Sequence, residues 1–508
     1  MVEMLQILSG WSGCRDDGTM MSDDNCTLTR GDLAARVAGL AEELHDLPRV
    51  IGLLGSNRTD WAVAQLAAWA AGKTVVPLPS FFSPLQLEHV LRDAAIDHIV
   101  ATRDAFWLAA ALGVATTPVS DRRAGTIPTP IPGAGVIVYT SGSTGQPKGV
   151  WLRLEQIDWQ AQALAEATEA SEHDLHLSVL PLSLLLEMIA AVCVPVLAGA
   201  RTHFASAVAH SVGAGRQADM LVEFERWRPT TTVLVPQLLS AWVAQLEARR
   251  KRSPEGLRFV AVGGAPVSEA LSERAWELGI PVHEGYGLTE CCSVVAVNRP
   301  GRRKARTVGE PLPGLDVRIE QGEVVVNGPT VMEGYLSTGA AKQPWRTGDL
   351  GNLDRDGFLR VTGRKDNLLV MASGRNVSPE WVEATLMGDP RVGACAVLGH
   401  GRPHLNLLLI PSLSGERWLT ESPRAHVLLW LEQVCVELPA YAVPKNFVVC
   451  GATEAKRIGL LTSNGRIVRD TAKKAYPALK AARCLAAARA SSMQPASKGE
   501  TPCCFTIG

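Results

Sequence analysis

Residues 139–149 read Tyr139-Thr140-Ser141-Gly142-Ser143-Thr144-Gly145-Gln146-Pro147-Lys148-Gly149. They follow the short apolar run Gly135–Val138, which is typical of a buried strand. Glycine lets a backbone approach an anion closely, and hydroxyl and amide groups can donate hydrogen bonds to phosphate oxygens. Lys148 adds a positive charge. The stretch therefore predicts a phosphate-binding loop that follows a strand.

Two other interpretations of this loop fit the sequence less well. A Walker A loop needs Gly-Lys-Ser/Thr after its second glycine, whereas Gly145 is followed by Gln146-Pro147-Lys148. A flexible surface loop can share the Ser/Thr/Gly composition, but the ordered ending Pro-Lys-Gly argues against it.

The loop resembles the phosphate loop of the adenylate-forming superfamily, which comprises acyl- and aryl-CoA synthetases, luciferases and peptide-synthetase adenylation domains. Further blocks resemble the superfamily and follow in its order. They are Gly263-Gly264-Ala265-Pro266, Gly285-Tyr286-Gly287-Leu288-Thr289-Glu290, Trp345-Arg346-Thr347-Gly348-Asp349-Leu350, Gly363-Arg364-Lys365-Asp366 and Asn464-Gly465-Arg466. The overall pattern is most similar to bacterial long-chain acyl-CoA synthetase-like proteins.

Length and charge restrict the protein class. A chain of 508 residues is longer than a single core usually supports, so we expect at least two domains. Lys and Arg total 50 and Asp and Glu total 51, which gives no support for nucleic-acid binding. The longest apolar run, 175–200, is interrupted by Pro181, Glu187 and Pro195, so we expect core rather than a membrane span. Peripheral membrane contact remains open.

The 11 cysteines indicate a reducing compartment, because they are odd in number and show no Cys-x-x-Cys spacing. No basic segment leads into a long apolar core at the N-terminus, so no secretory signal is evident. We therefore expect a cytoplasmic protein.

Strand and helix signals alternate, which predicts an α/β fold with parallel-rich sheets. Residues 33–44 place apolar side chains on one helical face, and Asp60 is a candidate cap for the helix that follows it. The segments 317–320 and 323–326 flank Gln321-Gly322 and predict a hairpin in a small β subdomain.

Four segments are expected along the chain. Residues 1–27 are polar and irregular and are expected to be loosely ordered. Residues 28–364 would form the adenylate-forming N-terminal domain. Residues 365–480 would form a small, mobile α+β lid, because the superfamily hinges near Lys365. The Ala/Ser-rich tail, 481–508, is expected to be disordered.

The resemblance implies a role for each block. The triphosphate would be held by Thr140, Ser141, Gly142, Ser143, Thr144, Gly145 and Lys148. The adenine slot would be formed by Gly263, Gly264, Ala265, Gly285, Tyr286 and Gly287. Thr289 would contact the α-phosphate, while Glu290 and Thr144 would hold Mg²⁺. Asp349 would accept hydrogen bonds from the ribose hydroxyls, with Arg364 nearby.

Two further positions concern the acyl-transfer and adenylation steps. Gly374 lies in a block that resembles the loop lining the pantetheine route in acyl-CoA synthetases. Arg466 stands where the superfamily normally has the catalytic lysine, and its planar, forked guanidinium is not a neutral replacement. The implied catalytic groups are therefore Arg466, Thr289, Glu290 and Lys148.

The resemblance implies an enzyme that activates a small-molecule hydrophobic carboxylic acid, a fatty acid above all, with ATP and Mg²⁺ and then transfers the acyl group to CoA. Two alternatives stay open: transfer to an acyl carrier protein, or a non-catalytic binder of ATP or acyl adenylate, because of Arg466. No acidic residue lies between Glu187 and Asp219, which disfavours an amino-acid substrate. Leu184 stands where the family often has histidine, and its apolar surroundings predict either a fatty-acid contact or packing core.

Overall fold

A computed structural model describes residues 2–14, 18–128, 133–140, 147–214, 216, 218–461 and 467–492. Contacts divide the chain into two compact units. The larger contains Met1–Leu368 with Ser378–Gly388, and the smaller contains Leu369–Val377 and continues from Asp389. The sequence places the boundary at 364/365, whereas the contacts place it at 368/369 and assign α13 (Pro379–Met387) to the larger unit.

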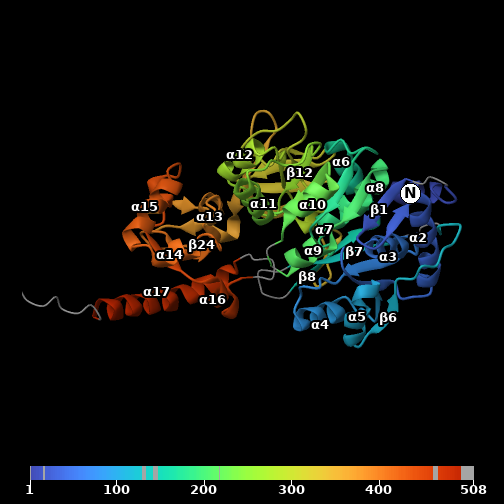
Figure 1. Cartoon of the computed structure of the whole chain (residues 1–508), viewed down its shortest axis with the longest axis horizontal. Helices are drawn as coiled ribbons and strands as arrows, with labels where there is room; N and C mark the ends of the chain where they lie inside the picture. Colours follow the sequence, from blue (N-terminus) through green and yellow to red (C-terminus); the bar gives the residue numbers. More distant parts are fainter. Residues whose placement is uncertain are drawn as a thin grey trace, which may run out of the picture. The chain divides into compact units, whose positions relative to one another are not determined.

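The first sheet of the larger unit has a parallel centre with antiparallel edges. Its strands, in spatial order, are β15 (Glu310–Pro311), β14 (Ala296–Val297), β13 (Val282–Tyr286), β12 (Phe259–Val262), β11 (Thr231–Leu234), β9 (Leu175–Ser178), β10 (Arg201–Phe204), β1 (Thr19–Asp23) and β2 (Thr27–Thr29). All pairings from β13 to β1 are parallel. The helices α10 (Met220–Trp227), α11 (Pro236–Arg249) and α12 (Glu269–Glu277) lie close to this sheet (Figure 1).

The second sheet is parallel from β7 to β6 and antiparallel beyond β7. Its strands, in spatial order, are β19 (Gly339–Ala340), β18 (Gly334–Tyr335), β8 (Lys148–Arg153), β7 (Gly135–Thr140), β4 (Thr74–Pro77), β3 (Val50–Leu54), β5 (His98–Ala101) and β6 (Ala115–Pro118). The antiparallel pairing of β7 with β8 means that the candidate phosphate loop connects two neighbouring strands. The α/β class with parallel-rich sheets is thus confirmed.

A four-stranded antiparallel sheet forms the β subdomain. Its strands, in spatial order, are β16 (Asp316–Glu320), β17 (Glu323–Asn327), β20 (Trp345–Leu353) and β21 (Leu359–Arg364). The predicted hairpin joins β16 to β17, and Gln321 and Gly322 have φ values of 51° and 81°. Two consecutive left-handed residues are what a type I′ turn requires, so the Gln-Gly pair fits this position.

The helix α2 (Arg30–Leu44) buries the predicted face and packs beside α3 (Thr59–Ala70). The expectation for Asp60 is wrong, because its side chain forms no cap on α3. Instead, its carboxylate pairs with the buried guanidinium of Arg36 at 2.8 Å. The local sequence favoured a cap, but in the folded chain the Asp60 carboxylate contacts the Arg36 guanidinium on α2 instead of a backbone N–H of α3.

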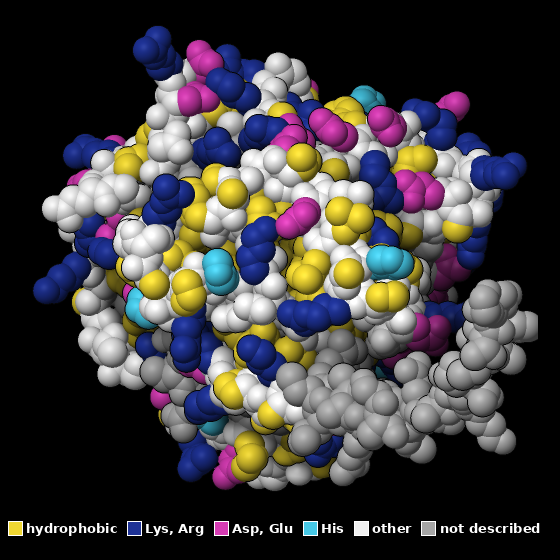
Figure 2. Space-filling view, turned by 90° about the vertical axis from the view of Figure 1, so that its left-hand side faces the viewer, with side chains coloured by type: hydrophobic (Ala, Val, Ile, Leu, Met, Phe, Trp, Pro, Cys, Tyr) yellow, Lys and Arg dark blue, Asp and Glu magenta, His cyan; other side chains and the backbone are white. Residues whose placement is uncertain are grey.

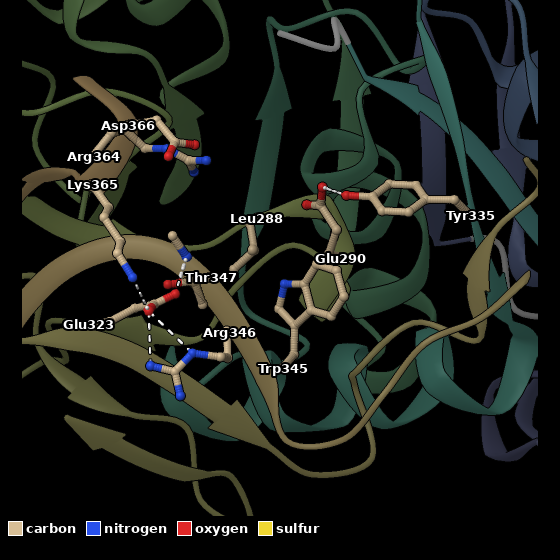
Figure 3. A pocket seen from close by; sticks show the side chains of 11 residues that line it. Leu288, Glu290, Glu323, Tyr335, Trp345, Arg346, Thr347, Arg364, Lys365 and Asp366 are labelled. Atoms are coloured by element: carbon tan, nitrogen blue, oxygen red, sulfur yellow. Dashed lines mark hydrogen bonds and ion pairs between the residues drawn. The ribbon is translucent and has the colours of Figure 1, made fainter. Parts of the chain in front are cut away.

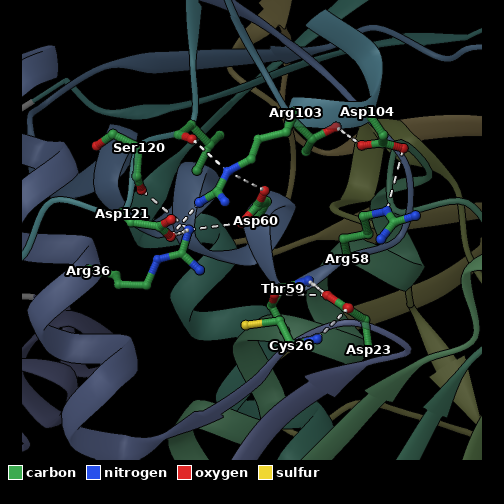
Figure 4. Close-up of polar contacts among 12 residues, drawn as sticks. Asp23, Cys26, Arg36, Arg58, Thr59, Asp60, Arg103, Asp104, Ser120 and Asp121 are labelled. Atoms are coloured by element: carbon green, nitrogen blue, oxygen red, sulfur yellow. Dashed lines mark hydrogen bonds and ion pairs between the residues drawn. The ribbon is translucent and has the colours of Figure 1, made fainter.

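Asp60 belongs to a cluster of ion pairs beyond the carboxyl ends of β3, β5 and β6, which we call the Arg36 network (Figure 4). Its members are Arg36, Arg58, Asp60, Arg103, Asp104 and Asp121. They line a cavity of about 410 Å³ together with Asp23, which accepts hydrogen bonds from the backbone N–H and hydroxyl of Thr59. Each charge of the network faces one of opposite sign.

The N-terminal segment differs from the expectation of loose order. This segment contains the helix α1 (Glu3–Gly10), whose side chains Met4, Leu5 and Leu8 are buried. It also contains β1, which is the second strand from one edge of the first sheet. Asp158 accepts hydrogen bonds from the backbone N–H groups of Glu3 and Met4 at 2.9 and 3.0 Å. This carboxylate satisfies orphan donors at the start of the helix. Because it lies far away in sequence, local composition could not reveal it.

The smaller unit combines an antiparallel–parallel sheet with helices. The sheet contains β24 (Val392–Leu398), β25 (Asn406–Pro411) and β26 (Asn446–Val449), and the helices include α15 (Arg424–Val434) and α17 (Arg469–Ser492). The helix α17 extends past the boundary expected at 480, and residues 493–508 lie outside the described part.

On the face shown in Figure 2, Lys and Arg side chains are interleaved with hydrophobic ones. Among the described helices, none combines the length and apolarity needed to cross a membrane.

Candidate active site

The candidate phosphate loop is anchored at both of its described ends. Thr140 ends β7, Lys148 begins β8, and the two residues are paired across the antiparallel ladder. The Lys148 ammonium nitrogen lies 5.7 Å from the centroid of the Tyr335 ring, within the range of a cation–π interaction. The predicted phosphate ligands Ser141, Gly142, Ser143, Thr144 and Gly145 lie outside the described residues.

The predicted adenine slot lies beyond the carboxyl ends of two adjacent parallel strands. Gly263, Gly264 and Ala265 follow β12, while Gly285 and Tyr286 end β13. The register pairs Val262 with Glu284, so the two glycine blocks are neighbours. Carboxyl ends of parallel strands are the common location of ligand sites in α/β sheets.

Gly287 has a steric requirement of its own. A Cβ built at this position would lie 1.5 Å from the carbonyl oxygen of Ser293, so a larger residue would force the backbone apart. The glycine is therefore needed for the close approach of two chain segments, whatever else it contacts.

Asp349 is held between an aromatic and a cationic donor. Its Oδ2 accepts a 2.6 Å hydrogen bond from the Tyr286 hydroxyl, and its Oδ1 accepts one of 3.1 Å from Arg364. Burial raises the pKa of Asp349, while the bonds from Tyr286 and Arg364 oppose that shift. Burial also raises the pKa of Tyr286, which keeps its hydroxyl protonated and donating. Three separately predicted residues thus meet in one cluster.

Thr289 and Glu290 lie in the short 3₁₀ turn η3 (Thr289–Cys291), directly after the glycine block. Glu290 lines a pocket of about 470 Å³, which we call the Glu290 pocket. Its lining residues are Leu288, Glu290, Glu323, Tyr335, Trp345, Arg346, Thr347, Gly348, Arg364, Lys365 and Asp366 (Figure 3). Oε1 of Glu290 accepts a 2.6 Å hydrogen bond from the Tyr335 hydroxyl.

A second carboxylate in this pocket, Glu323, was missed by the sequence analysis. It accepts hydrogen bonds from Arg346 at 2.9 Å, Lys365 at 3.3 Å and the backbone N–H of Gly348 at 3.1 Å. Burial alone would raise the pKa of Glu323, but these donors outweigh it and lower the pKa. One side chain therefore fixes the turn before Asp349 and the residue after Arg364, as Figure 3 shows. In the sequence, Glu323 follows the hairpin turn and belongs to no recognisable motif, so nothing there indicated a role in a binding site.

Two predicted residues are not among those described in the larger unit. Gly374 belongs to the smaller unit and has a φ of 77°, a backbone conformation that favours glycine. A Cβ at this position would meet no atom within 4 Å, so the backbone conformation rather than crowding selects glycine there. Arg466 lies outside the described residues.

Among the described residues, a magnesium ion could be bound by a carboxylate that shares the ion with substrate phosphates, but not by a cage of protein side chains. No group of three or more His, Cys, Asp or Glu side chains among them is arranged as a metal cage. Magnesium commonly uses one or two carboxylates together with substrate phosphates and water. Glu290, a pocket carboxylate in the same unit as the candidate phosphate loop, fits that role.

The chain matches the family model described as AMP-binding enzyme over residues 12–336 and the model described as AMP-binding enzyme C-terminal domain over residues 366–479. It belongs to the AMP-binding enzyme family. The expected membership in the adenylate-forming superfamily is thereby confirmed, as is the expectation of an enzyme.

Curated relatives are acid–CoA ligases by name. A 2-succinylbenzoate–CoA ligase of Bacillus licheniformis is 31% identical over 339 residues, which cover 62% of this chain and 66% of the relative. A feruloyl-CoA synthase of Amycolatopsis is 28% identical over 84% of this chain and 91% of the relative. A long-chain-fatty-acid–CoA ligase of Mycobacterium bovis is 26% identical over 76% and 77%.

Solved structures share the fold of this family member. The anthranilate CoA ligase AuaEII, in complex with anthranoyl-AMP, has a TM-score of 0.78 at 20% identity and covers 95% of this chain and 98% of its own. The o-succinylbenzoate CoA synthetase of Bacillus subtilis, in complex with ATP and magnesium ion, has a TM-score of 0.75 at 24% identity, with 91% and 98% covered.

The apolar segment around Leu184 is mainly packing core in this family member. Leu182, Leu185 and Met188 are buried in one core cluster, and Leu184 is half-buried against another. Glu187 is fully buried, and its burial raises its pKa to about 8. Of the two interpretations left open by the sequence, packing therefore accounts for most of these side chains.

Proposed function

We propose that the protein is an ATP-dependent acid–CoA ligase, which forms an acyl adenylate and then transfers the acyl group to the thiol of CoA. Family membership and the names of the relatives support the ligase class. The observation that carries the proposal is the cluster in which Asp349 meets Tyr286 and Arg364, and Arg364 lines the same pocket as Glu290.

In the first half-reaction, the substrate carboxylate attacks the α-phosphorus of ATP, and pyrophosphate leaves with the electron pair of the broken P–O bond. Both reactants are anions, so catalysis consists mainly of positioning and charge neutralisation. Lys148 would bind the triphosphate, and Asp349 would orient the ribose. Glu290 would hold Mg²⁺, which supplies positive charge to the phosphate oxygens when bound.

In the second half-reaction, the CoA thiol attacks the acyl carbonyl and AMP leaves. The loop that contains Gly374 and the residue Arg466 are proposed to serve the acyl-transfer and adenylation steps, on the basis of resemblance. An acyl carrier protein is the alternative acceptor, and no relative named above supports it.

The proposed acid is a hydrophobic carboxylic acid, with a fatty acid as the specific case. Support comes from the lack of an acidic residue between Glu187 and Asp219 and from the long-chain-fatty-acid relative. The other named relatives act on aromatic acids by name, so a substrate panel must contain both classes.

ATP–pyrophosphate exchange tests the proposal directly. We expect exchange that depends on an added acid and is strongest with a hydrophobic one. Acyl-CoA should then accumulate when CoA is supplied, whereas product on a holo-carrier protein alone would favour the alternative acceptor. Tight ATP binding without exchange for any acid, aromatic or aliphatic, would show instead a non-catalytic binder.

A further inference from the structure

Tyr335 connects two groups that the sequence places far apart. Its hydroxyl donates a 2.6 Å hydrogen bond to Oε1 of Glu290, and its ring centroid lies 5.7 Å from the ammonium nitrogen of Lys148. Figure 3 shows the hydroxyl directed at the Glu290 carboxylate. One side chain therefore touches both the candidate metal ligand and the candidate phosphate-loop cation.

The backbone around Tyr335 is tied to both partners. The N–H of Leu336 donates to the carbonyl of Gly149 at 3.0 Å, next to Lys148, and the N–H of Met332 donates to the carbonyl of Glu290 at 2.9 Å. The Tyr335 ring also packs edge-on against Trp345, with centroids 6.2 Å apart. The side chain is thus fixed relative to both segments.

The hydrogen bond selects one oxygen of the carboxylate. A carboxylate only accepts hydrogen bonds, so the Tyr335 phenol is the donor. Oε1 is engaged by this donor, whereas no hydrogen bond to Oε2 is found among the described residues. A carboxylate oriented in this way presents a defined oxygen to a cation.

We propose that Tyr335 is a positioning residue that sets the separation between the metal-holding oxygen of Glu290 and the phosphate-loop cation of Lys148. The inference rests on the proposed function, because the ligand it serves is a magnesium-bound triphosphate. The hydroxyl orients the Glu290 carboxylate, and the ring holds the Lys148 ammonium group in place by a cation–π contact. Substitutions that remove only the hydroxyl, or the whole ring, therefore separate the two contributions.

The Tyr335→Phe substitution removes the hydroxyl and keeps the ring. We expect the Mg²⁺ concentration for half-maximal ATP–pyrophosphate exchange to rise about tenfold, as for the loss of other outer-shell metal partners. The KM for ATP at saturating Mg²⁺ should stay within about twofold, since the ring contact to Lys148 remains. Tyr335→Leu should raise both quantities. Calorimetric titration with ATP, at limiting and at saturating Mg²⁺, should show the same split without turnover.

Thr230→Val is the matched control, because the Thr230 hydroxyl donates a hydrogen bond of similar length, 2.7 Å, to the carboxylate of Asp174. It should leave the Mg²⁺ dependence unchanged. Combining Tyr335→Phe with Glu290→Gln should add no shift beyond Glu290→Gln alone. Wild-type Mg²⁺ dependence in Tyr335→Phe, or an equal loss of ATP affinity at both Mg²⁺ levels, would overturn the inference. Failure of the proposed function looks different: wild-type protein itself would show no acid-dependent exchange at any Mg²⁺ concentration.

Discussion

The Glu290 pocket and the Arg36 network both concentrate charge in the larger unit, but they neutralise it differently. In the Arg36 network, every aspartate faces an arginine, as in the 2.8 Å pair of Asp60 with Arg36. In the Glu290 pocket, Glu323 also pairs with cations, but Glu290 accepts from the neutral Tyr335 hydroxyl. Lys148, next to this pocket's Tyr335, faces the ring of the same tyrosine. Charges that satisfy one another hold a fold together, whereas charges left with neutral partners remain available to a ligand.

The largest expected effect tests the ligand side of this comparison. Asp349→Ala removes the acceptor shared by Tyr286 and Arg364 and the proposed ribose contact. We expect ATP–pyrophosphate exchange to fall about 1,000-fold, which corresponds to roughly 4 kcal/mol. Exchange within tenfold of the wild-type rate would show that Asp349 is a structural turn residue. Thermal unfolding of the same preparation separates loss of the site from loss of the fold.

The next effect tests the structural side. Arg36→Met keeps the apolar stem of a buried side chain but leaves Asp60 and Asp121 without their shared cation. We expect the free energy of unfolding to fall by about 3 kcal/mol, measured by urea denaturation, because the largely buried Asp60 would keep only its longer, 3.7 Å ion pair with Arg103. The dissociation constant for ATP should remain within about twofold. A specific loss of ATP affinity without destabilisation would contradict the assignment of this network to the fold.

Glu187 gives the comparison a third case, a buried carboxylate with no ion pair to a cation among the described residues. Burial raises its pKa from the ordinary 4.5 to about 8. The unfolded chain therefore loses this proton before the folded one does, and stability falls as the pH rises from about 4.5 to 8. Glu187→Gln removes the titration, so the variant should gain about 4 kcal/mol relative to wild type by pH 8.

Urea denaturation of both proteins at pH 5 and pH 8 measures this difference, with the two pH values chosen as approximate ends of the titration. The gap between variant and wild type should widen with rising pH. A constant gap would mean that Glu187 finds a charged partner in the folded state, as the aspartates of the Arg36 network do.

Local patterns sufficed for much of the fold. The Gln321-Gly322 pair fixed a hairpin because the turn requires left-handed residues, and the apolar spacing in α2 required one buried face. The resemblance of the ordered blocks to the superfamily was enough to assign Tyr286 and Asp349 to one predicted site, and the structure brings the two side chains together. These features depend on residues that are neighbours in the sequence or on the fixed order of the blocks along the chain.

The missed features depend on partners that are distant in sequence. Asp158 caps α1 from another helix, and Arg36 takes Asp60 away from its expected capping role. Tyr335 and Glu323 carried no recognisable chemistry of their own, because their significance arises from Lys148, Glu290 and the turn before Asp349. Pairwise geometry of this kind is absent from a single sequence, whose periodicity reports burial but not the identity of the partner.

The smallest expected effect compares two cations directly. Lys148→Met keeps the side-chain length and removes the charge near the Tyr335 ring, so we expect the KM for ATP to rise about tenfold, equivalent to about 1.4 kcal/mol. Arg103→Met removes one positive charge from the Arg36 network and is the matched control. Steady-state exchange at several salt concentrations should show a weaker salt dependence for Lys148→Met alone, because the lost attraction is electrostatic. Equal changes in both variants would mean that ATP responds to the overall charge of the unit, and the distinction between available and mutually paired charges would fail.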